Sequence, residues 1–205
     1  MKHRDLAPAG FAVLVLLAVL LTLWQLTWGG RSFTSDSWRR LDLAAHPRAL
    51  PRPALRDELG LAVDWQALCQ RRWVLDFVYT RCTSVCQAQG VQAARMARML
   101  DTLGVSVWSI SLEPEVDDAQ ALERFKRNLQ GPQSSSWKLA HTRDEHTLQP
   151  LLDSAGVVRV REPDGSLSHN AAWYVVEPGC QLSQALSAQE MLETAQQWSS
   201  HATPL

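Results

Sequence analysis

The most apolar part of the chain is a continuous run near its N-terminus. Residues Gly10–Trp28 carry no charged side chain and read GFAVLVLLAVLLTLWQLTW. As a helix this run would cover about 28 Å, close to the thickness of the hydrocarbon core of a bilayer. Its length, and the lack of a small-x-small cleavage site after it, favour an uncleaved anchor over a cleaved signal peptide. The pattern predicts a single-pass transmembrane helix over residues 10–28, with Trp24 and Trp28 at the interface.

The charges that flank this run do not decide its orientation. Basic residues stand on both sides of it, at Lys2 and Arg4 before it and at Arg31, Arg39 and Arg40 after it. The positive-inside rule therefore favours neither side. Residues 1–9 are short enough to stay behind as a cytoplasmic tail, which would place the rest of the chain outside the cytoplasm.

The next segment has no sustained hydrophobic period. Residues 29–60 are charged and contain three prolines, Pro47, Pro51 and Pro53. Such a composition is typical of a stalk with extended, polyproline-like stretches. The remaining residues, 61–205, have the usual size of one domain.

Within that domain, runs with strand character alternate with runs of helical periodicity. Strands are predicted over 73–80, 105–112, 171–176 and 180–186, and helices over 85–103, 117–129, 143–155 and 188–198. Gly104 ends the first helix, and Pro150 is expected to break or kink the third. Strands alternating with helices predict an α/β layer architecture.

Composition narrows the possible functions. The chain has 205 residues, with 20 Lys and Arg against 21 Asp and Glu and a net charge of -1, which argues against nucleic acid as a partner. Apolar residues make up 46% of the chain, as in a folded globular protein. Four cysteines are too few for a disulfide scaffold, but Cys82 and Cys86 lie only four positions apart.

This cysteine pair lies where a buried strand turns into a helix. The helix dipole and Arg81 would stabilise a thiolate there. Residues at i and i+4 of a helix have β-carbons about 5–6 Å apart, whereas a disulfide needs about 3.5–4.5 Å. The spacing therefore favours a shared soft metal ion over a permanent crosslink. The alternative is a pair of small buried apolar residues.

A Cu(I) ion on two thiolates would need a third ligand to become three-coordinate. Of the six histidines, His169 is distinctive, because it stands immediately before a predicted strand and after the turn at Pro163–Gly165. On this pattern alone, a histidine before a strand is more often a surface or capping residue than a ligand.

Three segments together carry a resemblance to a known family. FVYTRCTSVC, SISLEPEVDDAQALERF and SHNAAWYVVEP resemble the corresponding motifs of the Sco/SenC proteins, over about residues 61–198. The resemblance implies a thioredoxin-like fold that holds one copper ion, Cu(I) or Cu(II), on Cys82, Cys86 and His169. It also implies an anchor in the inner membrane with the soluble domain in the periplasm.

The resemblance also suggests a partner. Sco/SenC proteins take part in assembling the binuclear copper centre of cytochrome c oxidase subunit II, as copper donors or as reductants of its cysteines. The implied partners are subunit II, or another periplasmic copper or thiol protein, and membrane lipid around residues 10–28.

The sequence departs from the family pattern at three places. Gln87 replaces the proline usual after the second cysteine, Ser168 replaces the aspartate usual before the histidine, and Glu113 stands where aspartate is usual. Loss of the acidic neighbour at position 168 could alter the orientation of His169 and the affinity for copper.

The thioredoxin-like topology also suggests a role for the other two cysteines. In such a sheet, the strand after His169 runs antiparallel to the strand before Cys82. Cys180 follows the first of these strands and Cys69 precedes the second, so they are expected to meet at the pole opposite the metal site. One hypothesis is a structural disulfide between Cys69 and Cys180 outside the cytoplasm, and the alternative is two unrelated thiols.

Three functions remain compatible with these residues. A copper-binding assembly factor, or metallochaperone, would need Cys82, Cys86 and His169. A membrane-anchored thiol-disulfide oxidoreductase would use Cys82 to attack a target disulfide and Cys86 to resolve it, and it could spare His169. A redox or copper sensor would use the same residues and act through a partner.

Overall fold

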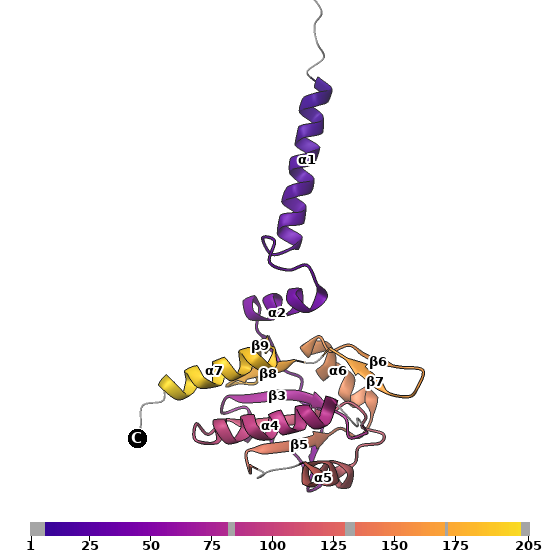
Figure 1. The fold of residues 1–205 in the computed structure, drawn as a ribbon, viewed down its shortest axis with the longest axis vertical. Helices are drawn as coiled ribbons and strands as arrows, with labels where there is room; N and C mark the ends of the chain where they lie inside the picture. Colours follow the sequence, from indigo (N-terminus) through magenta and orange to yellow (C-terminus); the bar gives the residue numbers. More distant parts are fainter. Residues whose placement is uncertain (1–6, 82–84, 130–133, 171, 202–205) are drawn as a thin grey trace, which may run out of the picture.

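The computed structural model describes residues 7–81, 85–129, 134–170 and 172–201 (Figure 1). Within these ranges it describes all side chains except those of residues 7–9, 85–89 and 201.

A mixed sheet of seven strands forms the centre of the described structure. Its strands are β1 (Arg48–Ala49), β2 (Arg56–Asp57), β3 (Trp73–Val78), β4 (Ser106–Ser111), β5 (Trp137–His141), β8 (Trp173–Glu177) and β9 (Gln181–Leu186). Their order across the sheet is β1-β9-β8-β3-β4-β5-β2. Strands β3, β4 and β5 are parallel, while β8, β9 and the two short edge strands pair antiparallel to their neighbours.

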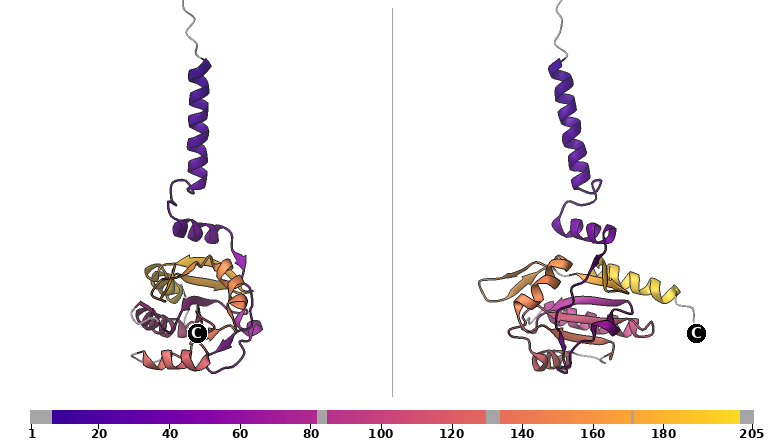
Figure 2. Two further views of the ribbon diagram at one scale, coloured as in Figure 1. Left: turned by 90° about the vertical axis from the view of Figure 1, so that its right-hand side faces the viewer. Right: turned by 180° about the vertical axis from the view of Figure 1, so that it is seen from behind.

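Helices cover both faces of this sheet (Figures 1 and 2). One face packs against α4 (Val85–Asp101), α5 (Ala119–Asn128) and α7 (Ala188–His201), and the other against α2 (Ser35–Ala45), the short α3 (Trp65–Leu68) and α6 (Glu145–Ala155). Strand β3 lies in the middle and is buried along its whole length, with Trp73 and Leu75 in one core and Val74 and Val78 in the other. A central strand with two buried faces explains the continuous apolar run that marked it in the sequence.

A separate hairpin leads from α6 back to the sheet. Strands β6 (Arg159–Arg161) and β7 (Leu167–His169) pair with each other only, and Figure 2 shows the hairpin extending beyond the sheet next to α6. The turn at its tip contains Gly165 at a φ of 83°, a backbone conformation that glycine adopts without strain. His169 is the last residue of the hairpin.

Most of the elements predicted from periodicity are confirmed. The predicted helices correspond to α4–α7, and the predicted strands to β3, β4, β8 and β9, although Ala171 lies outside the described residues. Strand β5 and the hairpin strands were not predicted. Pro150 does not end α6, which continues to Ala155 and is capped by Gly156 at a φ of 64°.

The prediction of an extended stalk is wrong for much of residues 29–60. This range contains α2, whose Thr34 and Ser37 form a reciprocal capping box, and the edge strands β1 and β2. Leu43 on α2 is buried in the core of the domain. Helix α2 is amphipathic and turns Leu43 inward, but the charges and prolines of the surrounding range favoured the prediction of a stalk.

Helix α1 (Ala7–Leu26) stands away from the rest of the chain (Figure 1). Its apolar side chains from Phe11 to Leu26 are largely exposed, unlike those of the sheet and the other helices. Among the described residues, no helix combines the length and apolar character required to cross a membrane.

Candidate functional site

The three predicted copper ligands are described to different extents. Cys82 lies outside the described residues, and Cys86 is described only by its backbone, in the first turn of α4. Of the three, only His169 has a described side chain. Among the described residues, no group of three or more His, Cys, Asp or Glu side chains is placed to hold a metal ion.

His169 lies beside the chain that leads into Cys82. Its ring makes an edge-on contact with Tyr79, with the ring centroids 6.5 Å apart and the planes at 77°. Tyr79 follows the end of β3 and precedes Cys82 by three positions. The hairpin therefore brings His169 to the carboxyl end of the central strand. His169 and Tyr79 are far apart in the sequence, so helical or strand periodicity could not predict their contact.

The imidazole of His169 is partly buried and incompletely paired. Its Nδ1 atom is inaccessible to solvent and has no hydrogen-bond partner within the described part of the chain. Burial lowers the pKa of His169 below its usual value, because the charged form loses hydration. A neutral imidazole with an unpaired ring nitrogen has the protonation state and the free lone pair required of a metal ligand.

Asp117 fixes the residues that enter the cysteine turn. This carboxylate is fully buried in the loop after β4. It accepts hydrogen bonds from the backbone N–H of Thr80 at 3.1 Å, from the Thr80 hydroxyl at 2.5 Å and from the Ser111 hydroxyl at 2.7 Å. In the sequence, Asp117 is one of several acidic residues at the start of a predicted helix, and no periodic pattern marks it out. Its role is to tie the end of β3 to the end of β4.

Removing the Asp117 carboxylate is expected to destabilise the domain. The variant Asp117→Ala leaves one backbone N–H and two hydroxyl groups in the interior without their acceptor, at a cost of roughly 2–4 kcal/mol in the free energy of unfolding. Urea unfolding followed by circular dichroism measures this cost. Asp118→Ala is the matched control, because the adjacent Asp118 is exposed and caps α5 through one bond to Ala121. An equal loss in both variants would contradict the role given to Asp117.

Arg81 does not act as an isolated positive charge. Its guanidinium forms a two-bond ion pair with the buried Glu113, with Nε 3.2 Å from Oε2. Arg161 of the hairpin bonds the same carboxylate at 3.1 Å. Desolvation raises the pKa of Glu113, but the hydrogen bonds and charges of the two arginines outweigh it and leave that pKa lowered. Two guanidinium groups thus face the Glu113 carboxylate, and the buried Asp117 carboxylate also interacts with Arg81, so the four groups together carry no net charge.

This ion-pair cluster shows what the glutamate at position 113 does. Its carboxylate joins the residue before Cys82 to the hairpin that ends at His169. Arg159, on the same hairpin, donates a hydrogen bond to the carbonyl of Leu112 at 2.6 Å. The hairpin is therefore attached to the loop after β4 by two arginine side chains.

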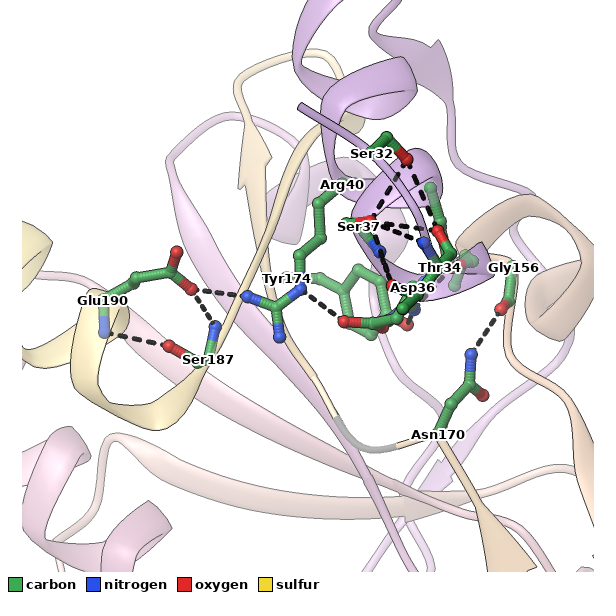
Figure 3. Close-up of polar contacts among 12 residues, drawn as sticks. Ser32, Thr34, Asp36, Ser37, Arg40, Gly156, Asn170, Tyr174, Ser187 and Glu190 are labelled. Atoms are coloured by element: carbon green, nitrogen blue, oxygen red, sulfur yellow. Dashed lines mark hydrogen bonds and ion pairs between the residues drawn. The ribbon is translucent and has the colours of Figure 1, made fainter. Parts of the chain in front are cut away.

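Asn170 holds the chain immediately after His169. Its Oδ1 accepts from the backbone N–H of Val158 at 2.8 Å, and its Nδ2 donates to the carbonyl of Gly156 at 2.9 Å (Figure 3). Both partners belong to the link between α6 and β6. The backbone at His169 is thus fixed on one side by the pairing of β7 with β6 and on the other by Asn170.

The remaining two cysteines form a disulfide. Cys69 ends α3 just before β3, and Cys180 lies between β8 and β9. Their Cα atoms are 4.8 Å apart, and the bond joins positions separated by 111 residues. The antiparallel pairing of β8 with β3 brings them together, at the opposite end of β3 from Cys82. The bond has the pairing expected from the thioredoxin-like topology.

These features define a class of protein: a thioredoxin-like α/β domain with a cysteine pair after its central strand and a histidine beside that strand's end. The family model described as SCO1/SenC matches residues 49–201. The chain therefore belongs to the SCO1/SenC family, and its matched region includes β2 and the last residue of β1, both within the predicted stalk.

The chain is also similar to a named SCO1 relative. The chain is 23% identical over 124 residues to a SCO1 protein homolog of Bacillus subtilis (strain 168). The match covers 58% of this chain and 63% of the relative, so it spans less than two thirds of that protein's length.

Solved structures of Sco proteins share the fold. A SCO1/SenC family lipoprotein from Bacillus anthracis str. Ames has a TM-score of 0.67 at 18% identity, over 77% of this chain and 98% of that one. BsSco, described as a member of the Sco family of cytochrome c oxidase assembly proteins and as having a disulfide switch, has a TM-score of 0.61 at 20% identity, over 76% and 97%. ScoI of Bradyrhizobium japonicum, solved with copper bound, has a TM-score of 0.59 at 19% identity, over 73% and 99%.

Proposed function

We propose that this protein is a copper-binding assembly factor in which Cys82, Cys86 and His169 hold one copper ion as cargo. The observation that carries the proposal is the buried Nδ1 of His169, which has no hydrogen-bond partner among the described residues. The ring lies beside Tyr79, and Tyr79 precedes Cys82 by three positions. A buried polar atom without a partner is costly, and a bound ion is one of the explanations for it. Membership of a family with copper-bound members supports copper as the ion.

The donor set suits copper chemically. Two thiolates and one imidazole are soft to intermediate ligands, which favour Cu(I) over hard ions such as Mg²⁺. The N-terminal end of α4, where Cys86 lies in the first turn, favours an ionised thiol. Transfer then requires only ligand exchange with the cysteines or histidines of an apo target.

The target we propose is the binuclear copper site of cytochrome c oxidase subunit II. Support comes from the family, since BsSco is described as belonging to the cytochrome c oxidase assembly proteins. The protein would either deliver copper to that site or reduce its cysteine pair before copper enters.

We propose that the apolar residues 10–28 attach the protein to the inner membrane, although the described residues of α1 do not meet the requirements of a spanning helix, and that the domain lies on the periplasmic side. The exposed apolar side chains of α1 and its separation from the domain support this anchor. The disulfide between Cys69 and Cys180 supports an oxidising compartment. A similar solved structure is described as a SCO1/SenC family lipoprotein, which supports association with a membrane.

A Cu(I) competition titration of the full chain in detergent tests the proposal. The reduced protein should bind one equivalent tightly, and His169→Ala should weaken binding at least tenfold, or about 1.4 kcal/mol. His141→Ala is the control, because His141 lies on β5 and its Nδ1 contacts the carbonyl of Thr142. Weak binding that is indifferent to His169 would reject the copper function and leave a thiol-disulfide reductant that uses Cys82 and Cys86.

A further inference from the structure

A buried arginine fastens α2 to the domain. Arg39 lies on α2 and is only 8% exposed. Its Nη1 donates to the carbonyl of Ala155, the last residue of α6, at 3.3 Å and to the hydroxyl of Tyr174 on β8, and its Nη2 pairs with Asp36. One guanidinium therefore joins α2 to a helix end and to a strand next to the centre of the sheet.

The stem of Arg39 lies directly on the backbone of Gly156. A Cβ atom at position 156 would lie 2.6 Å from Cδ of Arg39, closer than nonbonded carbon atoms approach. Gly156 also has a φ of 64°, in the left-handed region that glycine favours. Position 156 therefore requires glycine both for the end of α6 and for the approach of Arg39.

The same glycine is the partner of the residue after His169. The carbonyl of Gly156 accepts the hydrogen bond from Asn170 Nδ2 (Figure 3). Arg39 on α2 is therefore linked to the candidate copper ligand in three steps. Arg39 contacts Gly156, Gly156 accepts a hydrogen bond from Asn170, and a peptide bond joins Asn170 to His169.

Apolar packing does not fill the space around this path. A cavity of about 310 Å³ lies between α2 and the α6–β6 link, and its lining includes Trp38, Arg39, Gly156 and Asn170. Where side chains do not fill the space between two elements, specific hydrogen bonds do more to fix how those elements lie relative to each other. Because Nδ1 of His169 has no partner in the described structure, the ring lacks an anchoring bond there. Its placement depends on the backbone at positions 169–170 and on Tyr79.

We infer that Arg39 is a positioning residue for His169, so that α2, the helix between the proposed anchor and the domain, sets the affinity of the copper site. The inference rests on the proposed function, because it requires His169 to be a ligand. It adds a second role for α2 beyond connecting α1 to the domain.

The test is a double-mutant cycle of Cu(I) affinity, measured on the reduced full chain in detergent. Arg39→Met keeps the stem over Gly156 and removes the three hydrogen-bonding contacts of the guanidinium. It should weaken Cu(I) binding about tenfold, as loss of groups that orient a ligand commonly does. In a His169→Ala background the same substitution should change affinity less than twofold. Arg40→Met is the matched control: Arg40, also on α2, pairs with Asp36 and Glu190 and should leave affinity unchanged.

A second variant acts at the other end of the path. Asn170→Asp keeps the acceptor for Val158 and loses the donor to Gly156, so it should weaken Cu(I) binding in the same His169-dependent way. In the metal-free protein, both Arg39→Met and Asn170→Asp should shift the ring ¹⁵N resonances of His169 but not those of His141. This spectrum reports on ring placement even if Arg39→Met lowers stability.

The outcomes separate the two proposals. If His169→Ala leaves Cu(I) affinity unchanged, the proposed function fails. If His169→Ala weakens binding but Arg39→Met does not, or if Arg39→Met weakens it equally in both backgrounds, the proposed function stands and the positioning role of Arg39 is overturned.

Discussion

Replacing Cys69 and Cys180 together with alanine is expected to lower the free energy of unfolding by about 4–5 kcal/mol. Their disulfide closes a loop between positions separated by 111 residues, and constraint of the unfolded chain grows with the size of the loop. The loss is a large fraction of the stability of a typical domain. Urea unfolding of the oxidised protein and of the double variant measures it.

Reduction provides the control for this experiment. Dithiothreitol should bring the wild type down to the stability of the double variant and should leave the variant itself unchanged. Because alanine and cysteine both carry a Cβ, the substitution keeps whatever strain Cys180 has at its φ of 58°. A double variant as stable as the oxidised wild type would show that the disulfide does not stabilise the fold. Loss of stability on reducing the variant would point instead to Cys82 and Cys86.

The central strand and the helices around the candidate site were predictable from local signals, but the hairpin that carries His169 was not. Strand β3 is buried on both faces and reads as a continuous apolar run, while α4–α7 show helical periodicity. The thioredoxin-like order of strands also predicted that Cys69 and Cys180 meet, and at which end of the sheet. Periodicity is a strong guide wherever one element supplies its own buried face.

The parts that sequence reasoning missed depend on contacts between distant segments. Helix α2 is mostly polar, and it buries Arg39 and Leu43 only because α6 and the sheet receive them. The pairing of Glu113 with Arg81 and Arg161 joins three segments that no local pattern connects. A buried arginine or glutamate has the same appearance in a sequence as an exposed one, so charge patterning alone cannot place it.

Asp76 is another buried charged residue that the sequence did not single out. It stands within the apolar run that predicts a buried strand. It lies on β3, only 3% exposed, and accepts a hydrogen bond from the Ser109 hydroxyl. Its other oxygen, Oδ2, has no partner among the described residues. Burial raises the pKa of Asp76 to about 7, against the opposing effect of the Ser109 hydrogen bond.

This raised pKa predicts how stability depends on pH. At a pH below its usual pKa of 3.8, Asp76 is protonated in both the folded and the unfolded state and does not lower the free energy of unfolding. As pH rises from there, the unfolded state ionises first, so the folded state binds more protons and stability falls until the pH passes about 7. The total loss is about 4 kcal/mol, of which about 3 kcal/mol falls between pH 4.5 and 8.

The variant Asp76→Asn should remove this dependence, because asparagine cannot ionise and still accepts the Ser109 hydrogen bond. The difference in free energy of unfolding between wild type and variant, measured with urea from pH 4.5 to 8, should shift by about 3 kcal/mol in favour of the variant. Ser109→Ala gives the opposite control: without the hydroxyl that stabilises the carboxylate, the pKa of Asp76 should rise further and the dependence should extend to higher pH. A wild type and an Asp76→Asn variant with parallel pH profiles would mean that Asp76 titrates normally, and that water reaches its carboxyl group in the folded state.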